Sequence, residues 1–240
     1  MLRSENACGN ESRDCHDQKP KTLASKLVLR QFGLSLSTCH KVRGPDKIRE
    51  GVATVIYFRE IEEDDAELLL RWRTSPEITR FMVSNISFDL EAQKRWIASR
   101  YRLESYYHWI LEYNGVPVGF MSLTGWDSIR GIANWSYYVA EPVPPGVAYH
   151  APLHFFKWAF EELDVCELRA VVFYTNTRVV RLNTLYGFKF APERDHIIQK
   201  DGRDILMIAM ALSSKSFATL KPLSYHVPIP TAKWICSKNK

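Results

Sequence analysis

The chain has 240 residues, of which 46% are hydrophobic, and a formal net charge of +5 at neutral pH. This length and composition indicate one globular domain with tails and exclude a chain that is disordered throughout. No apolar run in the sequence approaches the roughly 20 residues that cross a bilayer, so we expect no membrane association. The five cysteines are scattered and odd in number, and the first residues lack a secretory signal pattern, which favours a reducing cytoplasm.

The positive charge is concentrated at the two ends of the sequence. Residues 1–52 carry ten Lys and Arg against six Asp and Glu, and residues 213–240 carry five Lys and no acid. Residues 53–212 carry seventeen basic against twenty-one acidic side chains. Because this central part is mildly acidic, we expect no basic groove on the folded domain and predict no nucleic-acid partner.

Composition also divides the chain into three parts. Residues 1–52 have almost no apolar periodicity, so we predict a disordered basic extension there, a folded domain over 53–213 and a basic tail over 214–240. An organelle-targeting peptide stays open for the first part, although its acidic residues argue against one. Its cysteines and histidines do not match the spacing of a closed zinc site, and no metal is predicted.

In chain order, the folded part begins with a predicted strand at 53–61 and two predicted helices. An Asp64-x-x-Glu67 capping box followed by apolar residues at helical spacing predicts a helix over 64–75, which a proline ends. A second helix is predicted over 87–101 because its apolar residues recur on one stripe.

Strands then dominate, in a pattern typical of an antiparallel meander that leads into a strand, a helix and a closing hairpin. The Asn114-Gly115 pair is a type I′ turn signal, Asn176 is a predicted helix N-cap and Gly187 ends that helix. The predicted elements are strands at 106–113, 116–127, 131–140 and 166–176, helices at 150–164 and 176–187, and hairpin strands at 188–199 and 204–212.

The segment 176–190, NTRVVRLNTLYGFKF, resembles the Asn-x-x-Ala-x-x-Leu-Tyr-x-x-x-Gly-Phe motif of the GNAT superfamily of N-acetyltransferases, and the order of elements fits over about 160 residues. The resemblance implies an α/β (α+β) fold with a mixed, mostly antiparallel twisted sheet and helices on both faces. Within the superfamily, the segments LLRWRTSPEITRFMVSNISFDLEAQKRWI, GVPVGFMSLTGWD and ANWSYYVAEP resemble bacterial enzymes that acetylate a nucleotide-linked 4-amino sugar on the route to pseudaminic acid, the sugar of flagellin glycosylation. More distantly, the chain resembles ribosomal-protein alanine acetyltransferases.

The resemblance further implies acetyl-CoA as co-substrate, with its pantetheine arm added beside the strand at 135–140 and its pyrophosphate at the loop EPVPPGVAYH. This loop departs from the family's glycine-rich pattern, because it keeps one glycine, Gly146, and its prolines Pro144 and Pro145 donate no N–H. A degenerate domain that no longer binds the cofactor therefore stays open. The cofactor-binding residues implied are Tyr138, Val139, Ala140, Gly146, Val147, Ala148, Tyr149, Asn176 and Asn183.

Asn183 stands where the family often has a tyrosine that protonates the departing thiolate. An amide has no titratable proton near neutral pH, so we expect Asn183 to position the cofactor and not to act as a general acid. Tyr186 lies three residues along the same helix face and is a candidate for the site, with core packing as the alternative. Ser122 is the third candidate catalytic residue, and His108 and Asp127 are candidate bases.

The acceptor side is implied by the same resemblance. Arg73, Met82, Gln93 and Thr124 are the substrate-binding candidates. The guanidinium of Arg73 suits the diphosphate of a nucleotide sugar, and an exposed surface charge is the alternative. Gln93 stands where the family commonly has a histidine.

The predicted function is transfer of an acetyl group from acetyl-CoA to a primary amine, and the predicted amine is the 4-amino group of a UDP-4-amino-4,6-dideoxy-N-acetyl-altrosamine-like sugar. The alternatives are a protein N-terminal alanine acetyltransferase of the ribosomal type and a non-catalytic domain of the same fold. The expected partner is this small-molecule amine, and a homodimer stays open.

Overall fold

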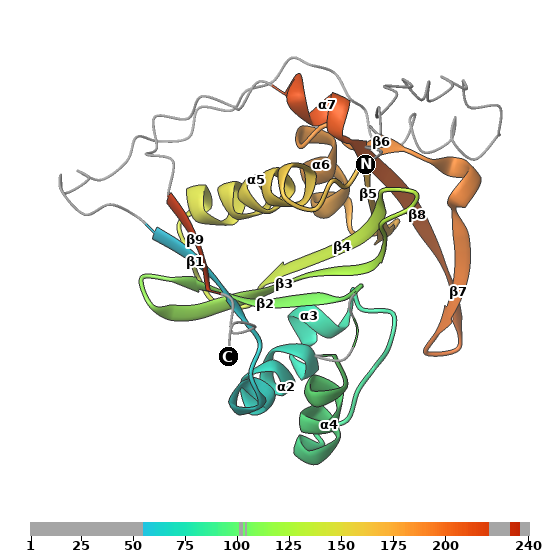
Figure 1. Cartoon of the computed structure of the whole chain (residues 1–240). Coiled ribbons are helices and arrows are strands. Elements are labelled where there is room, and N and C mark those ends of the chain that lie inside the picture. Colours follow the sequence, from blue (N-terminus) through green and yellow to red (C-terminus); the bar gives the residue numbers. More distant parts are fainter. Residues whose placement is uncertain (1–54, 101–102, 104, 221–230, 236–240) are drawn as a thin grey trace, which may run out of the picture. The chain divides into compact units, whose positions relative to one another are not determined.

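The computed structural model describes residues 55–100, 103, 105–220 and 231–235 (Figure 1). The predicted N-terminal extension lies outside the described residues. The described elements form a mixed α/β fold around one sheet, in agreement with the predicted fold class. Among the described residues, no helix has the length and apolar character needed to cross a membrane.

The first strand, β1 (Val55–Glu60), leads into the 3₁₀ turn η1 (Glu63–Asp65) and then into helices α2 (Ala66–Thr74), α3 (Pro76–Thr79) and α4 (Leu90–Arg100). The predicted capping box is displaced by two residues, because the Asp65 carboxylate accepts the Glu62 N–H (2.8 Å) and also pairs with Arg59. Helix α4 begins three residues later than predicted, since the Asp89 carboxylate accepts the Ala92 N–H (2.9 Å) and acts as its cap.

The predicted meander is confirmed. Its strands are β2 (Tyr107–Tyr113), β3 (Val116–Asp127) and β4 (Ile132–Val139), each antiparallel to the next. Asn114 (φ 52°) and Gly115 (φ 76°) both have positive φ, as a type I′ turn between β2 and β3 requires.

The second half of the domain follows in the predicted order. Its elements are α5 (Pro145–Glu161), β5 (Glu167–Phe173), α6 (Thr177–Leu185), β6 (Lys189–Phe190), η2 (Pro192–Arg194), β7 (His196–Lys200), β8 (Arg203–Ser213), α7 (Ser214–Ala218) and β9 (Thr231–Ile235). Helix α5 starts five residues before the predicted 150, because proline at the first helical position needs no hydrogen-bond acceptor for an N–H. The predicted tail contains α7 and also β9, which pairs in parallel with β1.

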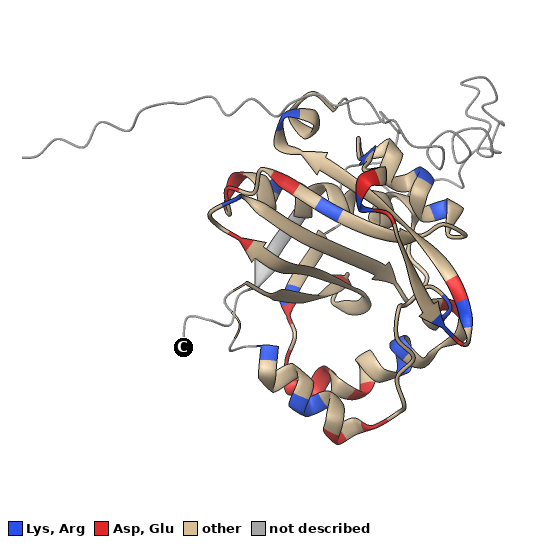
Figure 2. Cartoon of the chain, turned by 90° about the vertical axis from the view of Figure 1, so that its right-hand side faces the viewer, with Lys and Arg blue, Asp and Glu red and all other residues tan. Residues whose placement is uncertain are grey.

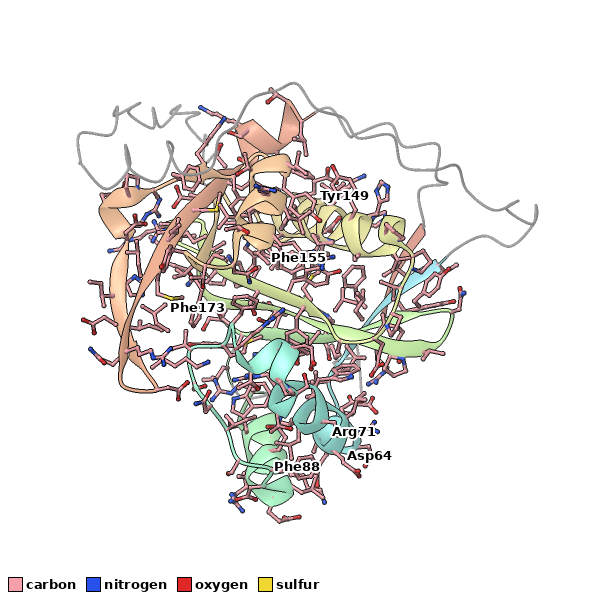
Figure 3. All side chains as sticks on the ribbon, turned by 180° about the vertical axis from the view of Figure 1, so that it is seen from behind. Asp64, Arg71, Phe88, Tyr149, Phe155 and Phe173 are labelled. Carbon is pink, nitrogen blue, oxygen red and sulfur yellow. The ribbon has the colours of Figure 1, made fainter. Side chains whose placement is uncertain are left out.

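The nine-stranded sheet has the order β6-β8-β5-β4-β3-β2-β1-β9, with β7 also paired to β8. Helices cover both faces: α2, α3 and α4 lie on one side and α5 and α6 on the other (Figure 1). Figure 3 shows this division in the side chains, with Tyr149 and Phe155 on the α5 side and Asp64 and Arg71 on the α2 side.

Each face has its own core. On the α2 side, Leu69 and Trp72 pack with Ile97 of α4 and with Ile110 and Phe120 of the sheet. On the α5 side, aromatic rings pack edge to face or stacked, and this set comprises Trp109, Trp135, Phe155, Phe156 and Phe188. Burying each such ring stabilises the fold by about 1.5–3 kcal/mol. The central strands are therefore fixed from both sides.

Candidate active site

Strands β4 and β5 separate partway along their length. They run parallel, and their register contains the pairs Ile132↔Glu167, Ala133↔Leu168 and Asn134↔Arg169. Beyond Asn134, β4 stays paired with β3 as far as Val139 but has no further pair with β5. A V-shaped opening therefore lies between two strands in the middle of the sheet.

The backbone of β4 directs alternate residues into this opening. The carbonyl of Gly131 accepts the N–H of Glu167 (3.0 Å), and the N–H of Ala140 donates to a β3 carbonyl (2.8 Å). Because backbone groups alternate along a strand, odd-numbered residues here face β5 and even-numbered residues face β3. The N–H and C=O groups of Tyr137 and Val139 accordingly face the opening, where an extended ligand can pair with them as an added strand.

The predicted cofactor ligands on this strand divide accordingly. Val139 directs its backbone into the opening, whereas the backbone groups of Tyr138 and Ala140 face β3. Of the backbone groups at 137–140, those of Tyr137 and Val139 are therefore the ones available to an extended ligand. Val139 and Ala140 also line a cavity of about 350 Å³ between the end of β4 and helices α2 and α3. At this cavity, the Trp72 indole donates to the Glu141 carboxylate (2.8 Å).

The start of α5 offers one free backbone donor. Pro145 is the first helical residue and has no N–H, and the N–H groups of Val147 and Ala148 point at the Pro144 carbonyl (2.9 and 3.4 Å). The Gly146 N–H has no acceptor among the described residues. A single amide at a helix N-terminus can bind an anion, but this loop provides fewer donors than a glycine-rich cradle.

Asn183 is on the buried side of α6. Its side chain is 1% exposed, its Nδ2 lies 3.9 Å from the Met210 Sδ, and its Oδ1 is buried without a partner in the described structure. A buried acceptor without a partner costs about 1–3 kcal/mol. An N–H or S–H group of a ligand would remove this cost, and the arm of CoA carries both. Asn176, another predicted ligand, caps α6 by accepting the Val179 N–H (3.4 Å).

The structure places the candidate catalytic residue Tyr186 in the core, which favours the alternative of core packing. The side chain is fully buried, its hydroxyl donates to the Tyr149 carbonyl (3.0 Å), and its ring stacks on that of Tyr149 (5.3 Å between centroids). Burial, with a smaller contribution from Tyr137 and Tyr149, raises the pKa of this phenol far above its ordinary value. Tyr186 therefore joins α6 to α5 and keeps its proton.

On the α2 side of the sheet, the strands beside the opening are not covered by a helix. Asn134 and Ser136 of β4 are exposed although β4 is a central strand, and Val171 of β5 is 47% exposed. The predicted Ser122 is buried, with its Oγ 2.7 Å from that of Ser136. Sequence reasoning missed Asn134 and Ser136, although their alternation with apolar neighbours in ANWSYY was the available signal. This uncovered surface, the acceptor face, adjoins the end of the V.

Arg73 lies at the edge of the acceptor face. Its Nη2 contacts the Ser84 carbonyl (3.3 Å) and hydroxyl (3.4 Å), whereas its Nη1 is buried and has no partner in the described structure. Burial lowers the pKa of the Arg73 guanidinium, and the electrostatic interaction with Tyr138 acts in the opposite direction. A buried guanidinium nitrogen without an acceptor is suited to binding an anionic group.

The other predicted acceptor residues, Thr124, Met82 and Gln93, lie on three different elements. Thr124 is half-buried on β3, on the same strand face as Ser122. Met82 packs against the α2 core cluster, on the loop that carries Ser84. Gln93 is half-buried on α4, and none of the described hydrogen bonds joins its side chain to Arg73.

The two candidate bases, His108 and Asp127, are both engaged in contacts within the fold. His108 is buried among Trp96, Tyr106 and Phe120, and burial, followed by the charge of Arg100, lowers its pKa to about 4. The Asp127 carboxylate accepts the N–H groups of Ile129 and Arg130 in the turn after β3. His108 therefore packs in the core, and Asp127 stabilises the turn after β3. Among the described residues, no group of three His, Cys, Asp or Glu side chains could hold a metal ion.

A mixed sheet opened between its parallel central strands, followed by a helix N-terminus, defines the class of acyl-CoA-dependent N-acetyltransferases. The chain belongs to the GNAT acetyltransferase domain family, whose model matches residues 56–189. It is accordingly an enzyme that moves an acetyl group from acetyl-CoA to an amine.

The individual relatives and solved structures described next share less than 30% of their residues with this chain. The acetyltransferase PseH of Campylobacter jejuni is 27% identical over 128 residues, which cover 52% of this chain and 77% of that protein. The spermidine N-acetyltransferase of Vibrio cholerae, solved with CoA and spermine, superposes with a TM-score of 0.62 at 14% identity, covering 68% of this chain and 98% of the other. FdhC, described as a nucleotide-linked sugar GNAT, gives a TM-score of 0.56 at 18% identity, covering 68% and 89%. The two structures establish likeness of fold alone.

We expect Gly146→Pro to weaken acetyl-CoA binding by about tenfold, because it removes the one free N–H at the start of α5. Proline is tolerated in the first helical turn, so α5 should persist. Calorimetric titration with acetyl-CoA measures the change. Gly146→Ala keeps the N–H and is the control, with an expected dissociation constant near that of the unaltered protein; equal constants for the two variants would remove this amide from the site.

We expect Asn183→Leu to stabilise the free protein by about 1 kcal/mol and to weaken acetyl-CoA binding about threefold to tenfold. The substitution replaces a buried, unpaired oxygen by apolar atoms of similar volume, and it also removes the amide that we expect to contact the cofactor. Thermal unfolding and calorimetry measure the two effects. Arg181→Leu on the exposed side of α6 controls for an added leucine. A lower melting temperature with unchanged affinity would contradict the proposed contact.

Proposed function

We propose that this acetyltransferase acts on the 4-amino group of a nucleotide-linked deoxy amino sugar resembling UDP-4-amino-4,6-dideoxy-N-acetyl-altrosamine. The observation that carries the proposal is the buried, unpartnered Nη1 of Arg73 at the edge of the acceptor face. A diphosphate presents oxygens to a guanidinium in matching geometry, and a nucleotide sugar carries a diphosphate. The similarity to PseH and the fold shared with a nucleotide-linked sugar GNAT support the same choice.

The charge of the acceptor face argues against a polyamine. A spermidine N-acetyltransferase is among the structural neighbours, but a polyamine is a polycation and needs carboxylates or carbonyls. The acceptor face instead presents Arg73 together with the uncharged Ser136 and Asn134. Over the described elements as a whole, basic and acidic residues are interspersed (Figure 2), in keeping with a proposal that includes no nucleic-acid partner.

In the proposed reaction, acetyl-CoA supplies the activated acetyl group, and a few residues of the opening and the acceptor face would position the reactants. The N–H groups of Tyr137 and Val139 would donate to the carbonyl oxygen on which negative charge develops. The exposed Ser136 hydroxyl, oriented by Ser122, would accept an N–H of the amine and hold it at the opening. Asn183 would contact the arm of the donor, and the amine proton would pass to water, since His108 cannot retain it at neutral pH.

A direct comparison of acceptors tests the proposal. The full chain is mixed with acetyl-CoA and, in turn, a UDP-linked 4-amino sugar, spermidine and a peptide that begins with alanine, and free CoA thiol is measured. Thiol release with the UDP-linked sugar above the other two is the expected result. Preference for the peptide would favour a ribosomal-type N-terminal acetyltransferase. No release from any acceptor, together with no calorimetric heat from acetyl-CoA, would indicate a non-catalytic domain.

A further inference from the structure

A buried lysine joins two segments that lie far apart in the sequence. Lys200, at the tip of the β7–β8 hairpin, donates from its Nζ to the carbonyls of Thr79 (2.6 Å) and Met82 (2.7 Å). The Lys200 side chain is 8% exposed. Figure 1 shows the hairpin extending from the sheet to the level of α3, which precedes this loop. The hairpin is therefore held against residues 79–85, the acceptor loop.

Further contacts surround this lysine. The Asn85 side chain donates to the Asp201 carboxylate (2.7 Å), directly beside Lys200 in the hairpin turn. The rings of Phe81 and Phe173 meet edge to face at 6.3 Å, and the Lys200 Nζ lies 5.6 Å from the centre of the Phe173 ring. Hairpin, acceptor loop and the end of β5 are thereby connected at one place.

The Lys200 ammonium is buried, so its hydrogen bonds to the two carbonyls are not readily replaced by bonds to water. Among the described ion pairs, none includes Lys200, so carbonyl oxygens and an aromatic ring are what compensate its buried charge. Removing the ammonium would leave the Thr79 and Met82 carbonyls without their side-chain donor. The Lys200 contact therefore fixes the position of the β7–β8 hairpin relative to the acceptor loop.

The acceptor loop is held from its other side by Arg73, whose Nη2 contacts Ser84. Lys200 and Arg73 thus fix the same loop at positions two residues apart. Through the contact of Phe81 with Phe173, the loop also reaches β5 two residues from the exposed Val171 of the acceptor face. We propose that Lys200 is a positioning residue that keeps the acceptor loop closed against the hairpin and so sets the affinity for the acceptor. It acts through the loop and touches neither acetyl-CoA nor the reacting amine. The inference rests on the proposed acceptor face but not on the identity of the sugar.

Steady-state kinetics of Lys200→Met is the first test. Methionine keeps the unbranched shape of the side chain up to the Cε position and lacks the three N–H donors, so the KM for the acceptor should rise about tenfold, while kcat changes less than about twofold. The dissociation constant for acetyl-CoA should not change. Lys200→Arg, which can donate to two carbonyls, should restore most of the KM. Lys189→Met, at an exposed position on the neighbouring strand β6, is the matched control.

Hydrogen exchange supplies a readout that needs no acceptor. In the native chain the N–H of Phe81 donates to Ile78 (3.1 Å) and that of Met82 donates to Thr79 (3.0 Å). Both amides should exchange about tenfold faster in Lys200→Met, with the amides of β5 unchanged. If these amides exchange faster in Lys200→Met but the unaltered chain does not acetylate the amino sugar, the role of Lys200 is supported and the proposed acceptor is rejected. Unchanged exchange, or a KM that rises equally in Lys189→Met, would overturn the inference.

Discussion

Replacing Arg73 with methionine should raise the KM for the nucleotide-linked amino sugar by about 10- to 100-fold. The expectation follows from the proposed contact of a phosphate oxygen with Nη1, which is buried and has no acceptor in the described structure. Hydrogen bonds to a charged group contribute about 1.5–3 kcal/mol, and each 1.4 kcal/mol is a factor of ten. The measurement is the initial rate as a function of acceptor concentration at saturating acetyl-CoA.

Two further variants separate the geometry of Arg73 from its charge. Arg73→Lys keeps the charge but loses the planar fork, so its KM should lie between those of the unaltered protein and Arg73→Met. Arg95→Met removes an exposed arginine from α4 and should have no effect on KM. An unchanged KM in Arg73→Met would show that the diphosphate is bound elsewhere, and a lower melting temperature alone would assign Arg73 to holding the acceptor loop.

Gly119→Ala should destabilise the domain by about 3 kcal/mol and also weaken acetyl-CoA binding. A Cβ at this position would lie 2.4 Å from the Tyr138 carbonyl oxygen and 3.2 Å from the Val139 Cα, both backbone atoms that cannot rotate away. Overpacking of this kind costs about 1–3 kcal/mol, at the upper end where backbone must shift. For a domain of this size the melting temperature should fall by roughly 6 to 12 °C.

The loss of binding follows from the place of the clash. Gly119 pairs with Val139, whose backbone faces the opening between β4 and β5, so a displaced β4 misplaces the groups that would pair with the donor. Gly115→Asn is the control, because the space around Gly115 is open and asparagine tolerates its φ of 76°. Thermal unfolding and calorimetry on both variants provide the comparison. A Gly119→Ala protein as stable as Gly115→Asn would contradict the close approach.

The order of elements could be predicted from local sequence, because alternation, capping residues and turn pairs act over a few residues. Asn114-Gly115 and the Asn176 cap are of this kind, and the structure has both. The boundaries moved where a neighbouring side chain competed, as when Asp65 replaced the predicted cap. The opening between β4 and β5 has no local signal, since both segments look like ordinary strands. It was accessible through family resemblance alone.

The candidate site was predictable to the extent that its chemistry lies in single residues. Arg73 and Asn183 were identified because the family resemblance assigns roles to their positions, and the chemistry of a guanidinium and of an amide then limits what each can do. Lys200 was missed because its partners are about 120 positions away in the sequence. Tyr186 was a candidate for catalysis because its hydroxyl could take part in proton transfer. The carbonyl that accepts a hydrogen bond from this hydroxyl belongs to another helix, α5, and the sequence does not indicate that contact. Long-range contacts of this type are set by tertiary packing.

The separation of β4 from β5 also gives the molecule a seam. The first four strands of the chain, with β9, lie on one side of it and β5, β6, β7 and β8 on the other. The two sides are joined in the sheet by the short ladder that ends at Asn134, between α5 and α6 by Tyr186, and across the acceptor loop by Lys200. A ligand arm lying in the seam would tie the two halves together along their length. The acetyl donor would then act mechanically as well as chemically: a cut in the link between α5 and β5 should yield two fragments whose reassembly depends on the concentration of CoA.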